Sequence, residues 1–199
     1  MLKNKIALYA IASAAGVASA LISPPPAEAQ VSAEIIDFTY AGNGCPGGSA
    51  RGVWDDVNKT LTLSFDKFAT TLPPGRSAAC NLAFVVKLPA AFQISLDRIE
   101  YLGYIDTEPS VSGQLRRWYK YGANEPLQLV SDFPPGTRDD FHIVDDVPWG
   151  SVCTTQETVL MNTRIDLGGT PSPGGTSEMV VDAQQYNTKV VFYFNLLPC

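Results

Sequence analysis

Six consecutive residues, Arg116-Arg117-Trp118-Tyr119-Lys120-Tyr121, combine basic and aromatic side chains of the kinds that contact sugars and anionic polymers. On a β-strand, successive side chains point to opposite faces, so Arg116, Trp118 and Lys120 share one face. An exposed indole between two cationic groups can stack on a sugar ring or contact an anionic polymer. The alternative is cross-strand aromatic packing, with the arginine stems lying over apolar surface. Arg116, Trp118 and Lys120 are our candidate ligand-binding residues.

Three acidic pairs, Asp55-Asp56, Asp139-Asp140 and Asp145-Asp146, are the candidate cation ligands. Ca²⁺ takes oxygen ligands from carboxylates and loop carbonyls, which makes acidic loops of an exported protein candidate sites. Neighbouring carboxylates on a strand point to opposite faces, however, and no EF-hand spacing is present. We therefore expect solvated surface pairs, no metal site and no cofactor, with Ca²⁺ binding as the open alternative.

No catalytic residue can be assigned from the sequence. His142 is the only histidine, so a site with several histidine ligands is excluded and any Ser-His-Asp arrangement must include this residue. It falls on the outward phase of an alternating stretch, which predicts a surface histidine. A glycosidase needs two carboxylates that face each other across a cleft, and the acidic residues do not single out such a pair.

The first 29 residues have the order of a secretory signal peptide. Lys3 and Lys5 precede the apolar run Ile6 to Ile22, and Ala27-Glu28-Ala29 forms an A-x-A cleavage site. The apolar run is near membrane-spanning length, so a retained anchor is the competing interpretation. We expect cleavage, no membrane span afterwards, and a secreted or cell-surface protein that would be periplasmic in a Gram-negative host.

Residues 30–199 have the size of one domain with its own core. Of 14 basic and 20 acidic residues in the chain, two lysines and one glutamate lie in the leader, which leaves 12 and 19. This acidic balance repels polyphosphate and excludes nucleic acid as a partner. The 16 glycines and 15 prolines, spread throughout, favour many short strands joined by turns.

Four cysteines, Cys45, Cys80, Cys153 and Cys199, indicate disulfides because the chain is expected to enter an oxidising compartment. No C-x-x-C or C-x-x-H pair supports a zinc site. Four cysteines permit three pairings, and the sequence alone does not choose among them. We expect Cys45 to pair with Cys80 and Cys153 with Cys199, each closing a loop of a few tens of residues and stabilising by roughly 3–4 kcal/mol. The glycines of Gly42 to Gly48 are expected to supply positive φ beside the first disulfide.

Alternation of apolar and polar residues predicts strands along most of the mature chain. The clearest examples are Thr60 to Phe65, Asn81 to Leu88, Val159 to Leu167 and Val190 to Leu196. The apolar phase slips after Leu96, which predicts a bulge or bend near Asp97-Arg98. The pattern indicates about eight to ten strands and no amphipathic helix. We predict an all-β fold, an antiparallel β-sandwich of jelly-roll or immunoglobulin-like type.

Several short motifs occur in a distinctive order along the mature chain. They are Gly42 to Pro46, Phe65 to Phe68, Cys80-Asn81, Trp149 shortly before Cys153, Asn162-Thr163 and the terminal Cys199. Together they resemble the domain of unknown function 4360 family of secreted, uncharacterised proteins in bacteria and fungi, over about Ile36 to Cys199. The resemblance implies a small exported β-rich protein with paired cysteines, and it implies no catalytic residues.

The sequence therefore favours an exported, non-enzymatic β-sandwich protein that binds a glycan or another cell-surface or matrix component. Two alternatives remain at this point. One is an extracellular polysaccharide hydrolase that uses two carboxylates, and the other is a secreted protein with a purely structural role.

Overall fold

The computed structural model describes residues 32–151, 153–181 and 189–199. The chain divides into two compact units, Met1–Gln30 and Val31–Cys199, and all described residues belong to the second. The signal peptide expected over residues 1–29 lies outside the described residues. Within the described ranges, no helix has the length and apolar character needed to cross a membrane.

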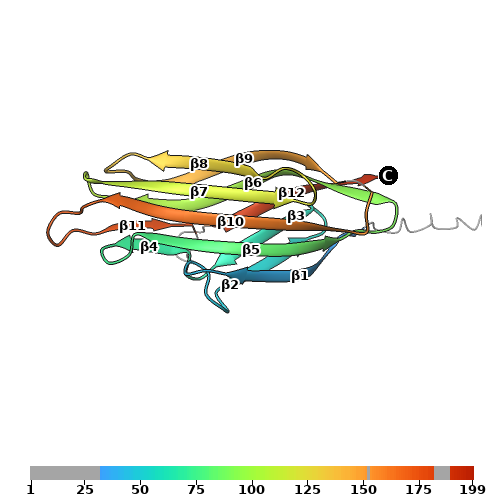
Figure 1. Ribbon diagram of the computed structural model, residues 1–199, viewed down its shortest axis with the longest axis horizontal. Helices are drawn as coiled ribbons and strands as arrows, with labels where there is room; N and C mark the ends of the chain where they lie inside the picture. Colours follow the sequence, from blue (N-terminus) through green and yellow to red (C-terminus); the bar gives the residue numbers. More distant parts are fainter. Residues whose placement is uncertain (1–31, 152, 182–188) are drawn as a thin grey trace, which may run out of the picture. The chain divides into compact units, whose positions relative to one another are not determined.

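The described residues form two antiparallel sheets packed as a sandwich, which confirms the predicted all-β class (Figure 1). The five-stranded sheet has the order β1 (Glu34–Ala41), β5 (Ser77–Lys87), β10 (Gln156–Gly169), β7 (Val111–Tyr121) and β8 (Leu127–Phe133). The seven-stranded sheet contains β2 (Ala50–Asp55), β3 (Thr60–Phe65), β12 (Lys189–Pro198), β6 (Phe92–Asp106), β11 (Ser177–Val180), β4 (Ala69–Leu72) and β9 (Arg138–Gly150).

Two strand positions in the larger sheet are each filled by two short strands in succession. β12 and β11 pair with the same edge of β6, Lys189 opposite Leu102 and Val180 opposite Tyr104. β3 and β4 continue this arrangement, because β3 pairs with β12 and β4 with β11. The twelve described strands therefore occupy ten strand positions, which agrees with the eight to ten expected.

The core lies between the sheets and follows from strict alternation along the central strands. In β5, in β7 and from Val159 to Leu167 of β10, every second residue is buried, and its neighbours face outward. Aromatic side chains from both sheets meet in this layer, as in the edge-to-face contact of Phe84 with Phe192, whose ring centroids lie 5.2 Å apart. The same alternation that fills the core therefore fixes which side chains reach the two outer faces.

The predicted bulge is present in β6. The register of β6 with β9 shifts between Leu96 and Arg98, and its register with β12 shifts at the facing residues Tyr193 and Phe194. One extra residue, Asp97, moves the buried positions from even to odd numbers.

Both disulfides have the expected pairing, Cys45 with Cys80 and Cys153 with Cys199. Cys45 and Cys80 are fully buried, and the turn beside them depends on close backbone contact. Gly42 has a φ of +150°, and a Cβ atom at this position would lie 2.1 Å from the carbonyl oxygen of Ala79. Only glycine fits there without a shift of the backbone.

Candidate functional site

The basic and aromatic stretch forms most of β7, which lies between β10 and β8 in the five-stranded sheet (Figure 1). Arg116, Trp118 and Lys120 point to the outer face of this sheet, whereas Tyr119 and Tyr121 are buried between the sheets. The predicted division of side chains between the two faces is confirmed. Because β7 has a partner strand on each side, Trp118 stands within the sheet and not at its edge.

Trp118 belongs to a row of side chains that crosses four strands of the outer face. It is in register with Asn162 on β10 and Gln128 on β8, and Asn162 is in turn opposite Asn81 on β5. The Asn162 side-chain amide donates a hydrogen bond to Asn81 Oδ1. The indole is therefore flanked by the primary amides of Gln128 and Asn162, and the amide of Asn81 lies beyond Asn162. Each of these amides both donates and accepts hydrogen bonds. We call this row the Trp118 face.

Two hollows border the indole. One has a volume of about 370 Å³ and is lined by Ala83 and Leu160 among others, and the second has about 480 Å³ and is lined by Gln128 and Val130 among others. Trp118, Asn81 and Asn162 line both hollows. The row thus forms a ridge with space on either side.

Sequence reasoning identified Trp118 but missed the amide row. Asn81, Asn162 and Gln128 are brought beside it by the pairing of strands that are far apart in the chain. The only local signal is that each of these polar residues sits on the outward phase of its own alternating strand. Register between distant strands is not readable from that phase.

Beneath the Trp118 face, the neighbouring Arg117 is held by a buried network. Its Nε and Nη2 atoms donate to the carboxylate of Asp145 on β9 at 2.7 and 3.1 Å. Nη1 donates to the carbonyl oxygen of Leu115 at 2.9 Å, and Nη2 also donates to Ser131 Oγ at 3.1 Å. The Tyr119 hydroxyl donates to Asp145 Oδ2 at 2.6 Å. The guanidinium and the carboxylate are thus both satisfied inside the protein.

The expectation of a solvated Asp145-Asp146 pair is wrong for Asp145, whose exposed fraction is only 4%. The alternation of β9 turns Asp145 inward toward Arg117 and leaves Asp146 outside. The inward phase of a strand usually predicts an apolar residue, and the compensating arginine lies 28 residues away.

The network also affects its tyrosines. Burial is the main cause that raises the pKa of Tyr119 well above its ordinary value, and the nearby Tyr101 and Asp145 raise it further. Burial likewise raises the pKa of Tyr101, whose hydroxyl lies 2.8 Å from that of Tyr119 and 3.1 Å from Thr163 Oγ1. These hydroxyls remain protonated donors across the physiological range.

The Asp55-Asp56 pair stabilises the hairpin turn between β2 and β3. Asp55 accepts hydrogen bonds from the backbone N–H groups of Val57 and Asn58 and from the Asn58 side chain. The hydrogen bond from the Asn58 side chain is the main cause that lowers the pKa of Asp55. Asp56 lies 2.8 Å from the Lys59 ammonium, and this hydrogen bond lowers its pKa. Across residues 32–151, 153–181 and 189–199, no three histidine, cysteine or acidic side chains come together as a metal site would require.

His142 lies on the outer face of β9 and is more than half exposed. Its Nε2 atom lies 3.2 Å from Glu100 Oε2 on β6. This is the surface histidine that the strand phase predicts.

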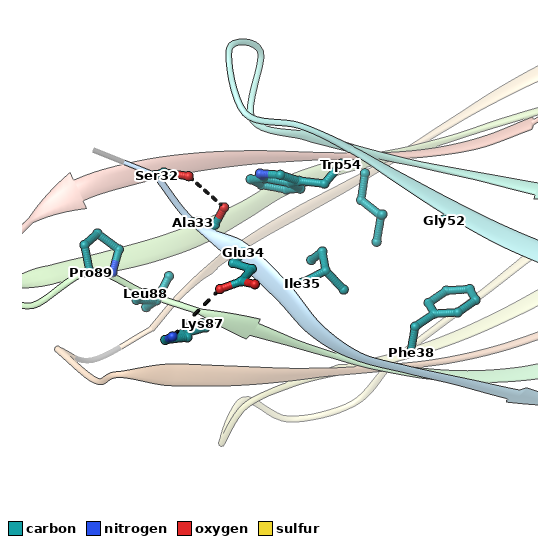
Figure 2. A pocket seen from close by; sticks show the side chains of 11 residues that line it. Ser32, Ala33, Glu34, Ile35, Phe38, Gly52, Trp54, Lys87, Leu88 and Pro89 are labelled. Atoms are coloured by element: carbon teal, nitrogen blue, oxygen red, sulfur yellow. Dashed lines mark hydrogen bonds and ion pairs between the residues drawn. The ribbon is translucent and has the colours of Figure 1, made fainter. Parts of the chain in front are cut away.

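A third hollow, of about 670 Å³, lies between the edge strands β1 and β2 (Figure 2). Trp54 and Gly52 of β2 lie across from Ile35 and Phe38 of β1. Glu34 is the only carboxylate among the described residues that line this hollow and the two beside Trp118. None of the three therefore presents the pair of facing carboxylates that glycoside hydrolysis needs.

A model of the family described as Domain of unknown function (DUF4360) matches residues 31–199. The chain belongs to this family. The match confirms the resemblance drawn from the order of the cysteine-bearing motifs. It extends over all of the described residues of this DUF4360 domain, including both disulfides and the Trp118 face.

One relative is an "Uncharacterized secreted protein" of Arthroderma benhamiae, which is 28% identical over 147 residues. The aligned part is 68% of this chain and 60% of the relative, so the DUF4360 chain spans about three fifths of the relative's length. The description of that protein as secreted agrees with the export predicted here.

Two solved structures are weakly similar to this chain. TmCBM61 in complex with beta-1,4-galactotriose is 13% identical with a TM-score of 0.33, over 81% of this chain and 90% of that one. The enzymatically active domain of tailspike protein 4 from bacteriophage CBA120 is 12% identical with a TM-score of 0.23, over 80% of this chain and 19% of that one. At these TM-scores neither likeness bears on the site.

Proposed function

We propose that this protein is an exported, non-enzymatic glycan-binding protein, and that a sugar ring stacks on Trp118. The observation that carries the proposal is the position of the indole. It faces outward within the five-stranded sheet, between two hollows, and is in register with amide side chains on both neighbouring strands. A flat apolar ring binds the apolar face of a sugar, and primary amides exchange hydrogen bonds with its hydroxyl groups.

The outer face of the other sheet offers a useful contrast. There the aromatic ring of Tyr193 on β12 is covered by Arg98, whose guanidinium carbon lies 4.0 Å from the ring centroid. No described aromatic or guanidinium group stacks on Trp118 in this way. An outward tryptophan without such a cover has a ring face available to a ligand, which supports binding over simple packing.

Substitution of Trp118 tests the proposal. We expect the wild-type protein to bind at least one class of polysaccharide on a glycan array, and Trp118→Ala to weaken this binding by about tenfold to a hundredfold, the range for loss of a central aromatic anchor. Tyr193→Ala is the matched control, because it removes an outward aromatic from the opposite sheet, and its binding should equal that of the wild type. Thermal unfolding of each variant shows whether it is folded.

Two results would overturn the proposal. The first is binding that survives Trp118→Ala in a folded protein, since the ligand would then sit elsewhere. The second is the absence of binding to every glycan tested, which is the outcome expected of a purely structural secreted protein.

A further inference from the structure

We propose that the glycan bound at the Trp118 face is anionic and that Arg116 and Arg164 together hold its carboxylate or sulfate group. This inference rests on the proposed function and adds the chemical class of the ligand. Arg116 on β7 and Arg164 on β10 are directly opposite each other in the sheet register. Both point to the outer face, with exposed side-chain fractions of 57% and 49%. They lie next to the pair formed by Trp118 and Asn162 on the same face.

Two like charges at directly opposed positions destabilise a sheet. Here they share one carboxylate, that of Asp166 on β10. Asp166 Oδ1 accepts a hydrogen bond from Arg164 Nε at 2.8 Å, whereas Asp166 Oδ2 lies 3.6 Å from Arg116 Nε, beyond hydrogen-bonding distance. One carboxylate therefore offsets only one of the two guanidinium charges. The repulsion between Arg116 and Arg164 lowers the stability of the sheet, and such a pair is expected where a ligand supplies the missing negative charge.

The atoms left over are the hydrogen-bond donors that an oxyanion needs. Arg116 donates from Nε to Gln114 Oε1, and Arg164 donates from Nε to Asp166. No described residue accepts a hydrogen bond from the Nη atoms of either guanidinium. A carboxylate or sulfate group can accept two hydrogen bonds from one guanidinium in a planar arrangement. Two guanidiniums side by side thus form a receptor for one anionic group.

The local charge opposes that of the whole chain. On the outer faces of β7, β8 and β10, the charged residues are Arg116, Lys120, Arg164, Asp132 and Asp166, three basic against two acidic. The formal net charge of the chain is −6. A basic site on an acidic protein directs an anionic group to the place beside the stacking ring, because the acidic remainder of the surface repels it.

Paired polysaccharides that differ only in charge test this inference. We would measure binding by calorimetry to polygalacturonate and to its fully methyl-esterified form, and to a sulfated galactan and its desulfated form. The first pair tests a carboxylate and the second a sulfate ester. We expect the charged member of one pair to bind about tenfold more tightly, because a hydrogen-bonded ion pair contributes on this scale, and this preference to fall with added salt.

Arg116→Gln and Arg164→Gln should each reduce this preference to about threefold or less. Arg51→Gln is the matched control, because Arg51 is an exposed arginine on β2 of the other sheet, and it should leave the preference unchanged. Equal binding of charged and neutral forms that still depends on Trp118 would overturn the anionic ligand but leave the proposed function intact. Charge-dependent binding that ignores Trp118 would overturn both. No binding to any of the four polysaccharides would overturn the anionic ligand, and the glycan array would then decide the proposed function.

Discussion

Arg117 of β7 and Asp145 of β9 form a two-point ion pair between the two sheets of the sandwich. Their side chains are only 3% and 4% exposed. A buried charge is tolerated when its partner and its remaining hydrogen-bonding atoms are satisfied, and this pair has backbone, serine and tyrosine partners as well. It joins the two sheets through the core.

Removing one member of this pair should destabilise the protein strongly. We expect Arg117→Met or Asp145→Leu alone to lower the free energy of unfolding by about 3–5 kcal/mol, because each leaves an uncompensated buried charge. The double variant leaves no charge and should recover much of the loss. Urea unfolding measures all three, and losses that simply add in the double variant would contradict the coupling.

Alkaline pH should destabilise the fold through its buried tyrosines. Burial raises the pKa of Tyr101, Tyr119 and Tyr121 above the ordinary value of 10.0, so the folded protein keeps protons that the unfolded chain releases. The free energy of unfolding is therefore unaffected well below pH 10 and falls above it, by at most about 1.4 kcal/mol per pH unit for each tyrosine.

Unfolding measured from pH 8 to pH 11 checks this dependence. Tyr121→Phe removes one of the three groups and should make the decline shallower. Tyr40→Phe is the control, because Tyr40 lies on the partly exposed β1 and its hydroxyl accepts a hydrogen bond from the backbone N–H of Gly48. The free energy of unfolding of this variant should decline with pH as steeply as that of the wild type. A stability that stays level up to pH 11 would be inconsistent with neutral buried tyrosines.

The turn at the first disulfide should reject any side chain at Gly42. We expect Gly42→Ala to cost about 1–3 kcal/mol, because the new Cβ would collide with the Ala79 carbonyl oxygen at an unfavourable φ. Gly47→Ala, five residues on, meets no described atom within 4 Å and should change stability by about 0.5 kcal/mol or less. Thermal unfolding of the two variants gives the comparison, and equal losses would show that the close contact is unimportant.

The two disulfides should differ in their access to reductant. Cys153 and Cys199 are exposed, whereas Cys45 and Cys80 are fully buried. Mild reduction of the folded protein followed by alkylation and mass spectrometry should therefore label Cys153 and Cys199 first. Loss of that crosslink should lower stability by about 4 kcal/mol in the chain-entropy model. Earlier labelling of Cys45 and Cys80 would mean that the turn beside the Cys45–Cys80 disulfide opens readily.

Much of the fold was predictable because its central strands alternate without interruption. The expected strand Thr60 to Phe65 has the observed bounds of β3, and the phase slip after Leu96 located the bulge at Asp97. The edge strands β1 and β2 were not predicted. β1 contains a register shift between Ile35 and Asp37, and both strands have few buried residues, so neither shows a regular pattern.

The candidate site was predictable only within a single strand. The outward position of Trp118 follows from the alternation of β7, but its partner Asn162 and the neighbouring Arg164 come from β10, about 45 residues later. Asp145 escaped prediction for a related reason. Its burial depends on an arginine in the opposite sheet, and a strand pattern contains no information about the layer that it faces.

The hydrogen bonds of Arg117 have a consequence for the residue that follows it. Trp118 is attached to a backbone whose preceding side chain is hydrogen-bonded to strands of both sheets, so the backbone that carries the indole is held in place. Such a platform loses little conformational entropy on association, and the ordering cost falls on the sugar chain. Stiff polysaccharides with a ribbon-like shape should then be retained better than flexible ones of the same composition, a selectivity based on persistence length as well as on chemistry.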